Sequence, residues 1–535
     1  TDYDNLYQSA LCRAQADWLV GINATRLFSI LYHKTLTVGR VQTPTLKILV
    51  DREAKISSFQ KEKYHIVQIV AGGMEAASER MGNADDAKAL KAACETAQAV
   101  CVSVTREKKT EQPPRLYDLT TLQREANRLF GFTAKQTLDY AQQLYEKKLL
   151  TYPRTDSQYL TDDMLPTAES LVSGLWPLLP FAAGLDLSPQ FGRVLNSKKV
   201  SDHHAIVPTI SAEKVDMASL PLGEREVLKL AAKGLLRAVD EPHRYAETVI
   251  TLDCSGQSFT AKGKTVLAPG WKRYEQEQTE AAPALPVVTE QQTLPVSAAS
   301  VKTGKTTPPK HFTEDTLLAA MENAGKEDMP DDAERKGIGT PATRSGIIEK
   351  LVSSGFVERR KSKKITNLLP TSTGTALITV LPEQLQSPQL TAEWEHRLKE
   401  IEHGEIAPDS FMGGIAAMLN ELVQTYNPIP GAEVLFPSGR EAVGKCPRCG
   451  AEVTESQKGF FCENRACSFV LWKNSRFFTA KKKALTKSLA AALLKNGRAP
   501  LKGCYSEKTG KTYDAVVLLE DDGQRTGYKL VFDNG

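Results

Sequence analysis

Two β-rich segments that flank a long helical one constrain the fold of this 535-residue chain more than any other feature. Residues 61–112 contain the strand-like runs YHIVQIV and AVCVSVT, and residues 242–306 contain YAETVITLDC and similar runs. The residues between them, 118–241, are predicted to be mostly helical because apolar residues recur there at helical spacing. The simplest arrangement makes the helical block an insertion in one β domain, so we expect strands from both segments to pair in one sheet.

The two flanking regions, residues 1–60 and 311–430, are also predicted to be helical. In the second, the helical stretch PATRSGIIEKLVSSGFV is followed by the basic stretch ERRKSKKITNLLP and another helix start. Helix, basic β-hairpin, helix is the order of a winged-helix unit, a common DNA-docking arrangement, and a plain helical hairpin is the alternative. A chain of this length holds about three or four domains.

Composition excludes several classes of protein. With 41% hydrophobic and 25% charged residues the chain is typical of globular proteins, and no apolar run approaches the roughly 18 to 20 residues that span a bilayer. The net charge of +4 is too small to indicate a partner. Of the nine cysteines four lie in one group, which indicates metal ligands in a reducing compartment rather than a disulfide framework.

The four grouped cysteines have the spacing of a zinc site. Cys446 and Cys449 form one knuckle, CPRC, and Cys462 and Cys467 form a second, CENRAC. Two such turns can converge on one tetrahedral ion, and four thiolates leave no open position for catalysis. The aromatic residues around the second knuckle either stack DNA bases or fill the core of a small zinc ribbon. Residues 476–535 are predicted to be a short α+β tail.

The stretch LLTYPRTDSQYL, residues 149–160, places a tyrosine beside many polar groups. A free phenol has a pKa of about 10, so a tyrosine nucleophile needs a nearby cation or base. In an extended segment Tyr152 and Arg154 point to the same side, and Pro153 disfavours helix at Tyr152. The arginine fork suits a phosphate. This geometry fits attack of a phenolate on a phosphodiester, whereas a core tyrosine beside a surface arginine is the alternative.

Three further motifs have the chemistry of phosphate contacts. SDHHAIVPT, residues 201–209, contains the vicinal pair His203 and His204, either of which can contact a phosphate or donate a proton. GRVQTPT, residues 39–45, and GIGTPATR, residues 337–344, are glycine-marked turns that enter helices and offer an arginine each. Helix N-termini bind phosphates, but simple helix capping is the alternative for both turns.

Taken together, these motifs resemble those of one known family, the type IA DNA topoisomerases, and within it the bacterial topoisomerase III group. The resemblance covers roughly residues 5–430, and five separate motifs occur in the family's order. They are ADWLVGINATR, LTVGRVQTPTL, LTYPRTDSQYL, DHHAIVPT and GIGTPATRSGIIEKLVSSGFVE. The cysteine ribbon and the tail are similar to C-terminal additions found in many members.

The resemblance implies a multidomain α+β fold. The family's toroid consists of helical cleft and tyrosine domains with a β-rich arch, here followed by a zinc ribbon and a small α+β tail. The expected domains are 1–60 and 308–430 as the two parts of the DNA cleft, 61–112 and 242–307 as the two parts of the arch, 113–241 as the helical domain with the active-site tyrosine, 440–475 as the ribbon, and 476–535 as a repeat-like tail.

The resemblance also implies roles for individual residues. Tyr152 would cut one DNA strand, forming a 5′-phosphotyrosine bond and a free 3′-hydroxyl, and the hydroxyl would reseal the strand after passage without ATP. Arg154 would orient the phosphate, and His203 matches the family's active-site histidine. The residues expected to hold the DNA backbone are Arg40, Gln42, Thr43, Thr340 and Arg344.

The sequence departs from the family in one respect. Family members begin with a Toprim domain, whose acidic cluster binds Mg²⁺ beside the scissile phosphate. No such cluster is found in these 535 residues, which start about where that domain should end. We therefore expect Mg²⁺ to depend on a Toprim domain, and we expect this polypeptide alone to bind single-stranded DNA but to relax or decatenate little.

Other functions are weighed against this one. A non-catalytic single-strand-binding fragment is the main alternative. A tyrosine recombinase would need an arginine after HHAI that is absent, and a zinc hydrolase would need an open metal site. The expected partners are single-stranded or negatively supercoiled DNA and a helicase, with no membrane. The protein is expected to be a monomer in the bacterial cytoplasm, associated with the nucleoid.

Overall fold

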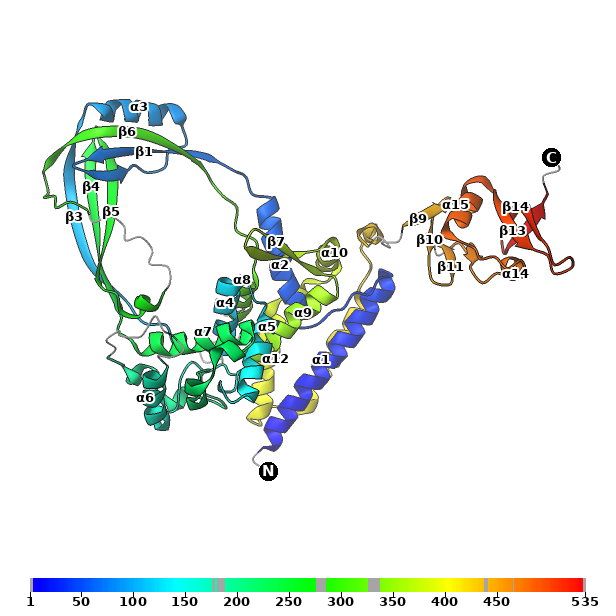
Figure 1. Ribbon diagram of the computed structural model, residues 1–535, viewed down its shortest axis with the longest axis horizontal. Coiled ribbons are helices and arrows are strands. Elements are labelled where there is room, and N and C mark those ends of the chain that lie inside the picture. The colour runs from blue at the N-terminus through cyan, green and yellow to red at the C-terminus, as the bar shows by residue number, and fades with distance from the viewer. Residues whose placement is uncertain are drawn as a thin grey trace. The chain divides into compact units, whose positions relative to one another are not determined.

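The computed structural model describes residues 3–175, 179, 188–275, 285–325, 337–436, 441–464 and 466–532. Contacts divide the chain into two compact units, Thr1–Pro430 and Gly431–Gly535 (Figure 1). No helix in the described ranges is long and apolar enough to cross a membrane. The finer domain boundaries inside the first unit stay predictions.

Six strands of the first unit form a closed barrel in the order β1-β2-β5-β4-β3-β6. They are β1 (Lys63–Ala71), β2 (Met74–Ala77), β3 (Gln98–Glu111), β4 (His243–Cys254), β5 (Gln257–Ala268) and β6 (Thr293–Lys305). β1 pairs with β6 along its whole length, and β3 pairs with β4. Strands from both β-rich segments therefore share one sheet, as the sequence pattern indicates.

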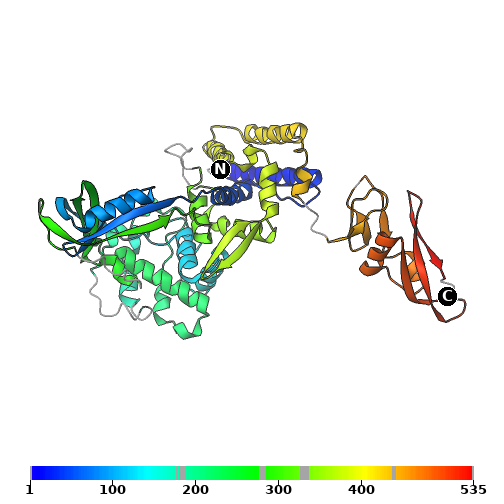
Figure 2. The same ribbon diagram turned by 90° about the horizontal axis from the view of Figure 1, so that it is seen from above.

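The barrel core follows from the alternation of side chains along its strands. On β1, Val67, Ile69 and Ala71 are buried while the residues between them are partly exposed, as expected where successive side chains point to opposite faces. Helix α3 (Ala84–Glu95) packs on β1 and β6 and adds Leu90 and Cys94 to this core (Figures 1 and 2).

A helical block separates β3 from β4 along the chain. Its helices are α4 (Leu119–Phe130), α5 (Ala134–Glu146), α6 (Leu165–Gly174) and α7 (Leu222–Val239). Both α4 and α5 begin with capping boxes, in which the side chains of Asp118 and Thr133 accept backbone N–H groups of the first turn. A single apolar cluster joins these helices.

The remaining elements of the first unit come from its two ends. They are α1 (Asp4–Leu31), α2 (Gln42–Ser57), α8 (Glu314–Asn323), α9 (Pro341–Ser353), β7 (Val357–Ser362), β8 (Ile365–Pro370), α10 (Ser372–Val380), α11 (Glu383–Gln386), α12 (Pro388–Glu402) and α13 (Pro408–Thr425). Helix α1 packs on α12 and α13. Phe312 forms an isolated β-bridge with Leu368 of β8. The bridge residue, the helices α8 and α9 and the β7–β8 hairpin follow one another in the order of a winged-helix unit. A plain helical hairpin is wrong, because 357–370 forms paired strands.

The second unit packs as one body around a shared core. It contains β9 (Ala442–Lys445), β10 (Glu452–Glu455), β11 (Gly459–Cys462), β12 (Val470–Trp472), α14 (Arg476–Thr479), α15 (Lys487–Asn496), β13 (Arg498–Tyr505), β14 (Thr512–Asp521) and β15 (Thr526–Val531). One apolar cluster includes Val453 and Phe460 of the ribbon and Leu493 and Val517 of the tail. The ribbon and the tail, each too short to bury much surface alone, thus complete each other's core.

Candidate active site and metal centre

The segment that carries Tyr152 is extended and lies against residues 203–209. The Thr151 N–H donates to the Val207 carbonyl oxygen at 3.0 Å, and the Thr155 hydroxyl donates to the His203 carbonyl oxygen at 2.8 Å. These bonds hold two motifs that are distant in the sequence side by side. His203, rather than His204, is thereby placed next to Tyr152.

The Tyr152 ring is held between two aromatic neighbours. The His203 ring lies 4.4 Å away between centroids, tilted by 47°. Tyr145, at the end of α5, approaches from another direction at 5.4 Å and 76°, an edge-to-face contact. Tyr152 itself is partly exposed. The two contacts fix the orientation of the phenol while its surroundings remain open to solvent.

A cavity of about 220 Å³ lies beside this tyrosine. The side chains that line it come from three segments: Arg154, Thr155, Asp156, Ser201, Asp202, His203, Thr340, Pro341 and Ala342. Arg154 is exposed, and its Nη1 donates to the Gln142 side chain of α5 at 2.5 Å. Arg154 and His203 are thus brought to one cavity beside Tyr152, together with two carboxylates that the sequence interpretation did not single out.

The third wall of the cavity is the N-terminus of α9. Thr340 caps this helix through a capping box with Thr343, and Pro341 is its first residue. Gly337, three residues earlier, has φ +66°, and a Cβ there would lie 2.2 Å from the Met321 carbonyl oxygen. Only glycine lets this turn lie against α8 and present the α9 N-terminus. The positive end of the helix dipole favours an anion in the cavity.

Arg40 has a different environment. It is buried, and its Nε donates to Asp17 at 2.7 Å while its Nη1 donates to Glu395 at 3.0 Å. Burial lowers the pKa of Arg40, but Asp17 and Glu395 outweigh that effect and raise it. The guanidinium is therefore committed to two carboxylates in this structure, and contact with a DNA phosphate stays a prediction.

Gln42 and Thr43, in the same turn, are also buried. The Gln42 amide donates to the Thr37 hydroxyl at 3.0 Å, and the Thr43 hydroxyl accepts the Gly39 N–H at 3.2 Å. These bonds shape the start of α2. Neither side chain caps α2, because both bonds join them to the preceding turn, and the DNA contacts of both residues stay predictions.

Arg344 is buried to 2% exposure. Its Nη1 donates to the Thr120 hydroxyl at 3.0 Å and its Nε to the Ile338 carbonyl oxygen at 3.2 Å. Burial lowers its pKa, partly offset by Glu322 and Asp118. In this structure it joins α9 to α4, so of the five residues expected to hold DNA only Thr340 lines the cavity.

Sequence reasoning missed four residues that the structure places here. Gln142 and Tyr145 lie on α5 and reach Arg154 and Tyr152 because the chain turns back after the helix end. Asp156 and Asp202 stand inside the motifs themselves and line the cavity. The sequence did offer a signal for Gln142 and Tyr145. The predicted helix that contains them ends only a few residues before Tyr152, so its last turn had to lie near the tyrosine.

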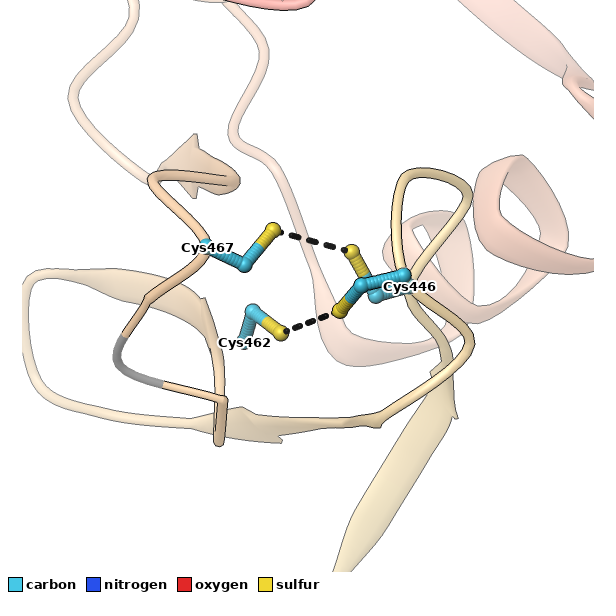
Figure 3. A group of neighbouring side chains, drawn as sticks. Cys446, Cys462 and Cys467 are labelled. Carbon is cyan, nitrogen blue, oxygen red and sulfur yellow. Dashed lines mark hydrogen bonds between the residues drawn. The ribbon is translucent and has the colours of Figure 1, made fainter.

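The four cysteines of the second unit converge on one point. Their sulfur atoms lie within 4.8 Å of one another, with 3.7 Å between Cys446 and Cys467 and 3.5 Å between Cys449 and Cys462. Figure 3 shows the sulfurs of Cys446, Cys462 and Cys467 turned toward a common centre. A tetrahedral site with Zn–S bonds of about 2.3 Å has sulfurs roughly 3.8 Å apart. The group therefore fits a zinc ion.

Backbone N–H groups point at these sulfurs and favour their thiolate forms. Burial raises the pKa of Cys446, while the N–H groups of Arg448 and Cys449 oppose that rise. The Ala451 N–H lowers the pKa of Cys449 to about 7. Thiolates are the form that binds metal. Among the described residues no other group of three or more potential metal ligands gathers in this way.

Comparison with known proteins identifies the family. A family model described as DNA topoisomerase matches residues 1–413. The DNA topoisomerase 3 of Bacillus subtilis strain 168 is 37% identical over 497 residues, covering 87% of this chain and 67% of that protein. The DNA topoisomerase 3 of Shouchella clausii is 35% identical over 513 residues, covering 90% and 69%.

A solved structure has the same fold. The full-length topoisomerase I of Thermotoga maritima superposes with a TM-score of 0.62 at 24% identity, over 85% of this chain and 74% of that one. This chain therefore shares its overall fold with a known topoisomerase. This chain belongs to the type IA DNA topoisomerase family. Its family is enzymatic, and DNA is its substrate.

Proposed function

We propose that Tyr152 is the nucleophile of a reversible DNA strand cleavage. One observation carries this proposal: the phenol is packed between Tyr145 and His203, and His203 lines a cavity together with Arg154 and the α9 N-terminus. A guanidinium and a helix N-terminus are both suited to a phosphate. No other tyrosine among the described residues lies beside this cavity in contact with His203.

The reaction balances without an energy source. The phenolic oxygen loses its proton and attacks phosphorus, the bond between phosphorus and the 3′ oxygen breaks, and that oxygen takes up a proton. The products are a 5′-phosphotyrosine and a 3′-hydroxyl. In the reverse reaction the hydroxyl attacks the phosphotyrosine and restores both starting bonds. Because one phosphodiester replaces another, ATP is not required.

Arg154 is proposed to orient the phosphate and to stabilise the charge that develops on it. Donors placed in advance at such a position stabilise the transition state strongly. Asp156 and Asp202 line the same cavity and oppose the approach of a phosphate. A divalent cation would offset them, which agrees with the Mg²⁺ that the family implies. The described residues offer no carboxylate cluster for it, so no step is assigned to the ion.

Cys446, Cys449, Cys462 and Cys467 are proposed to hold one zinc ion. The ion would supply structural cross-linking of the two knuckles, because four thiolates complete its coordination. The aromatic pair Phe461 and Trp472 lies in the same ribbon at 5.5 Å between centroids, and Trp472 is 45% exposed. We propose that this exposed ring stacks a base of a single DNA strand.

A covalent-adduct assay tests the nucleophile. A 5′- or 3′-labelled single-stranded oligonucleotide is incubated with the chain and Mg²⁺, and with a Toprim domain of a relative added in trans. The expected result is a protein–DNA adduct that retains the DNA on the 3′ side of the break, with none from Tyr152→Phe. An adduct of undiminished yield from Tyr152→Phe would assign the nucleophile elsewhere.

A second candidate is a single-strand-binding role without catalysis. It is favoured by the lack of a carboxylate cluster among the described residues. We expect the 535-residue polypeptide alone to show no Mg²⁺-dependent relaxation of negatively supercoiled plasmid. If no adduct forms even with the Toprim domain added, the binding role replaces the catalytic one. We further propose that the protein is a monomer that acts at the nucleoid in the cytoplasm, and that a helicase is its partner.

A further inference from the structure

The β7–β8 hairpin ends in a lysine cluster that the proposed reaction does not use. Its last pair is Ser362 with Ile365, so the loop consists of Lys363 and Lys364 alone. Both, and Lys361 on β7, are exposed. In the part of the chain that the structure describes, these three lysines, here called the wing tip, form no ion pair.

The base of the same hairpin is neutralised. Arg359 donates to Glu314 at 2.9 Å and to Glu349 of α9 at 3.1 Å, and Arg360 pairs with Glu358. Arg359 thus fastens the hairpin to α8 and α9, whereas Arg360 is neutralised within β7 itself. The uncompensated positive charge is confined to the wing tip, which points to an anion supplied from outside the protein.

The backbone of the wing tip gives an independent observation. Lys363 has φ +55°, a left-handed conformation. Glycine adopts this conformation without steric cost, and asparagine tolerates it better than most other residues. Lys363 therefore carries strain that a glycine would avoid.

The hairpin is bonded to α9, the helix whose N-terminus lines the cavity of the candidate active site. Residues Thr340 to Ala342 of α9 line the cavity, and the contact of Arg359 with Glu349 ties the hairpin to the same helix. The hairpin is therefore attached to the same helix whose N-terminus lines the cavity. Lysine is a point charge without a fork for reading base edges. Phosphate groups of the backbone are the partner that this chemistry fits.

We propose that the wing tip binds the sugar–phosphate backbone of DNA beside the cavity, without regard to sequence. This proposal rests on the proposed function in so far as DNA is the bound molecule. The backbone can belong to the single strand to be cut or to a flanking duplex, since both present the same phosphates.

The test compares two charge reversals of equal size. Lys363→Glu/Lys364→Glu alters the wing tip. Lys88→Glu/Lys91→Glu alters one exposed and one partly exposed lysine of α3 on the barrel, each of which is ion-paired within the helix. Dissociation constants for a labelled 25-nucleotide single strand and a 25-base-pair duplex are measured over a range of salt. The wing variant is expected to lower the slope of log K against log salt by about 1.4 for the single strand or 1.8 for the duplex, as for two lost contacts.

The pattern of loss identifies the source of the phosphates. A loss confined to the single strand assigns the wing tip to the cut strand, and a loss confined to the duplex assigns it to flanking DNA. Wild-type affinity and slope on both substrates, or an equal loss in the α3 variant, would overturn the proposal. If the wild-type chain binds neither DNA, the proposed function fails as well.

Lys363→Gly separates strain from binding. It removes the charge and relieves the left-handed lysine, so the melting temperature is expected to stay level or rise while DNA affinity falls. Unchanged affinity in a more stable protein would show that Lys363 does not bind DNA and would overturn its part in the proposal.

Discussion

The cysteine site and the tyrosine cavity are assembled over different ranges of the chain. All four cysteines lie between residues 446 and 467, in two knuckles joined by one hairpin. The tyrosine cavity draws Arg154, His203 and Thr340 from three segments that lie far apart in the sequence. The first site takes all its ligands from one short segment, whereas the second depends on packing between distant segments.

The same contrast separates the arginines. Arg154 is exposed at the cavity and donates to the neutral side-chain amide of Gln142. Arg40 is held by two carboxylates, and Arg344 is buried against α4. Arg40 and Arg344 belong to glycine-marked turns, whereas Arg154 stands in an extended segment after Tyr152. The difference teaches that an arginine near a glycine-marked turn can serve a fold contact, and that burial distinguishes it from an arginine open to a ligand.

Removal of zinc should have the largest effect of the changes considered, and it should affect the second unit but not the first. We expect chelation, or Cys446→Ser, to unfold the second unit, because structural zinc contributes on the order of 10 kcal/mol of folding free energy. The first unit should remain folded. Limited proteolysis and circular dichroism measure both, with Cys504→Ala as the control for a buried cysteine outside the metal group. A chelated protein with the protease pattern of the untreated one would contradict the zinc assignment.

Arg154→Ala should lower the rate of adduct formation without lowering the stability of the fold, as expected for an arginine that contacts the ligand. The rate of adduct formation is expected to fall by about 10²- to 10³-fold, as for loss of a donor to transition-state charge. The free energy of unfolding should change by less than about 0.5 kcal/mol, since the side chain is exposed.

Arg344→Ala is the matched control and should show the reverse. Its free energy of unfolding is expected to fall by about 2 to 3 kcal/mol, because the Thr120 hydroxyl and the Ile338 carbonyl oxygen lose their partner in a buried site. Equal instability in both variants would remove the distinction between the two arginines.

The two glycine-marked turns should respond differently to a methyl group. At Gly337, with φ +66° and two carbonyl oxygens within 2.4 Å of an added Cβ, alanine is expected to lower the free energy of unfolding by about 2 to 4 kcal/mol. At Gly39, where the nearest atom is 3.6 Å away, the change should stay below about 1 kcal/mol. Urea denaturation of both variants measures the difference, and similar losses would show that the two turns carry equal constraint.

Tyr145 should have the smallest effect on catalysis. Tyr145→Phe keeps the edge-to-face contact with Tyr152 and is expected to form adduct within about twofold of the wild type. Tyr145→Ala loses an aromatic pair of about 0.5 to 1.5 kcal/mol, so the rate should drop by roughly two- to tenfold. Rescue by phenylalanine distinguishes positioning of the phenol from a hydroxyl contact, and an inactive Tyr145→Phe would speak for the hydroxyl.

The sequence allowed accurate prediction wherever a pattern is local. The alternation on β1 and the order of α9, β7 and β8 follow from periodicity and turn residues. The pairing of Tyr152 with His203 needed the family motifs, because ring contacts between distant segments leave no spacing signal. The burial of Arg40 and Arg344 could not be predicted, since it depends on Glu395 and Thr120 from other parts of the chain.

The barrel has a consequence for how the protein is made. β6 closes it between β1 and β3, yet residues 112–292 must be synthesised after β3 before β6 emerges. At about 5–20 residues per second on the ribosome, the edges of β1 and β3 wait for roughly 10 to 40 seconds without their partner. During this interval they are open to pairing with another nascent chain. A chaperone that shields strand edges would therefore matter most for this protein before its own translation is complete.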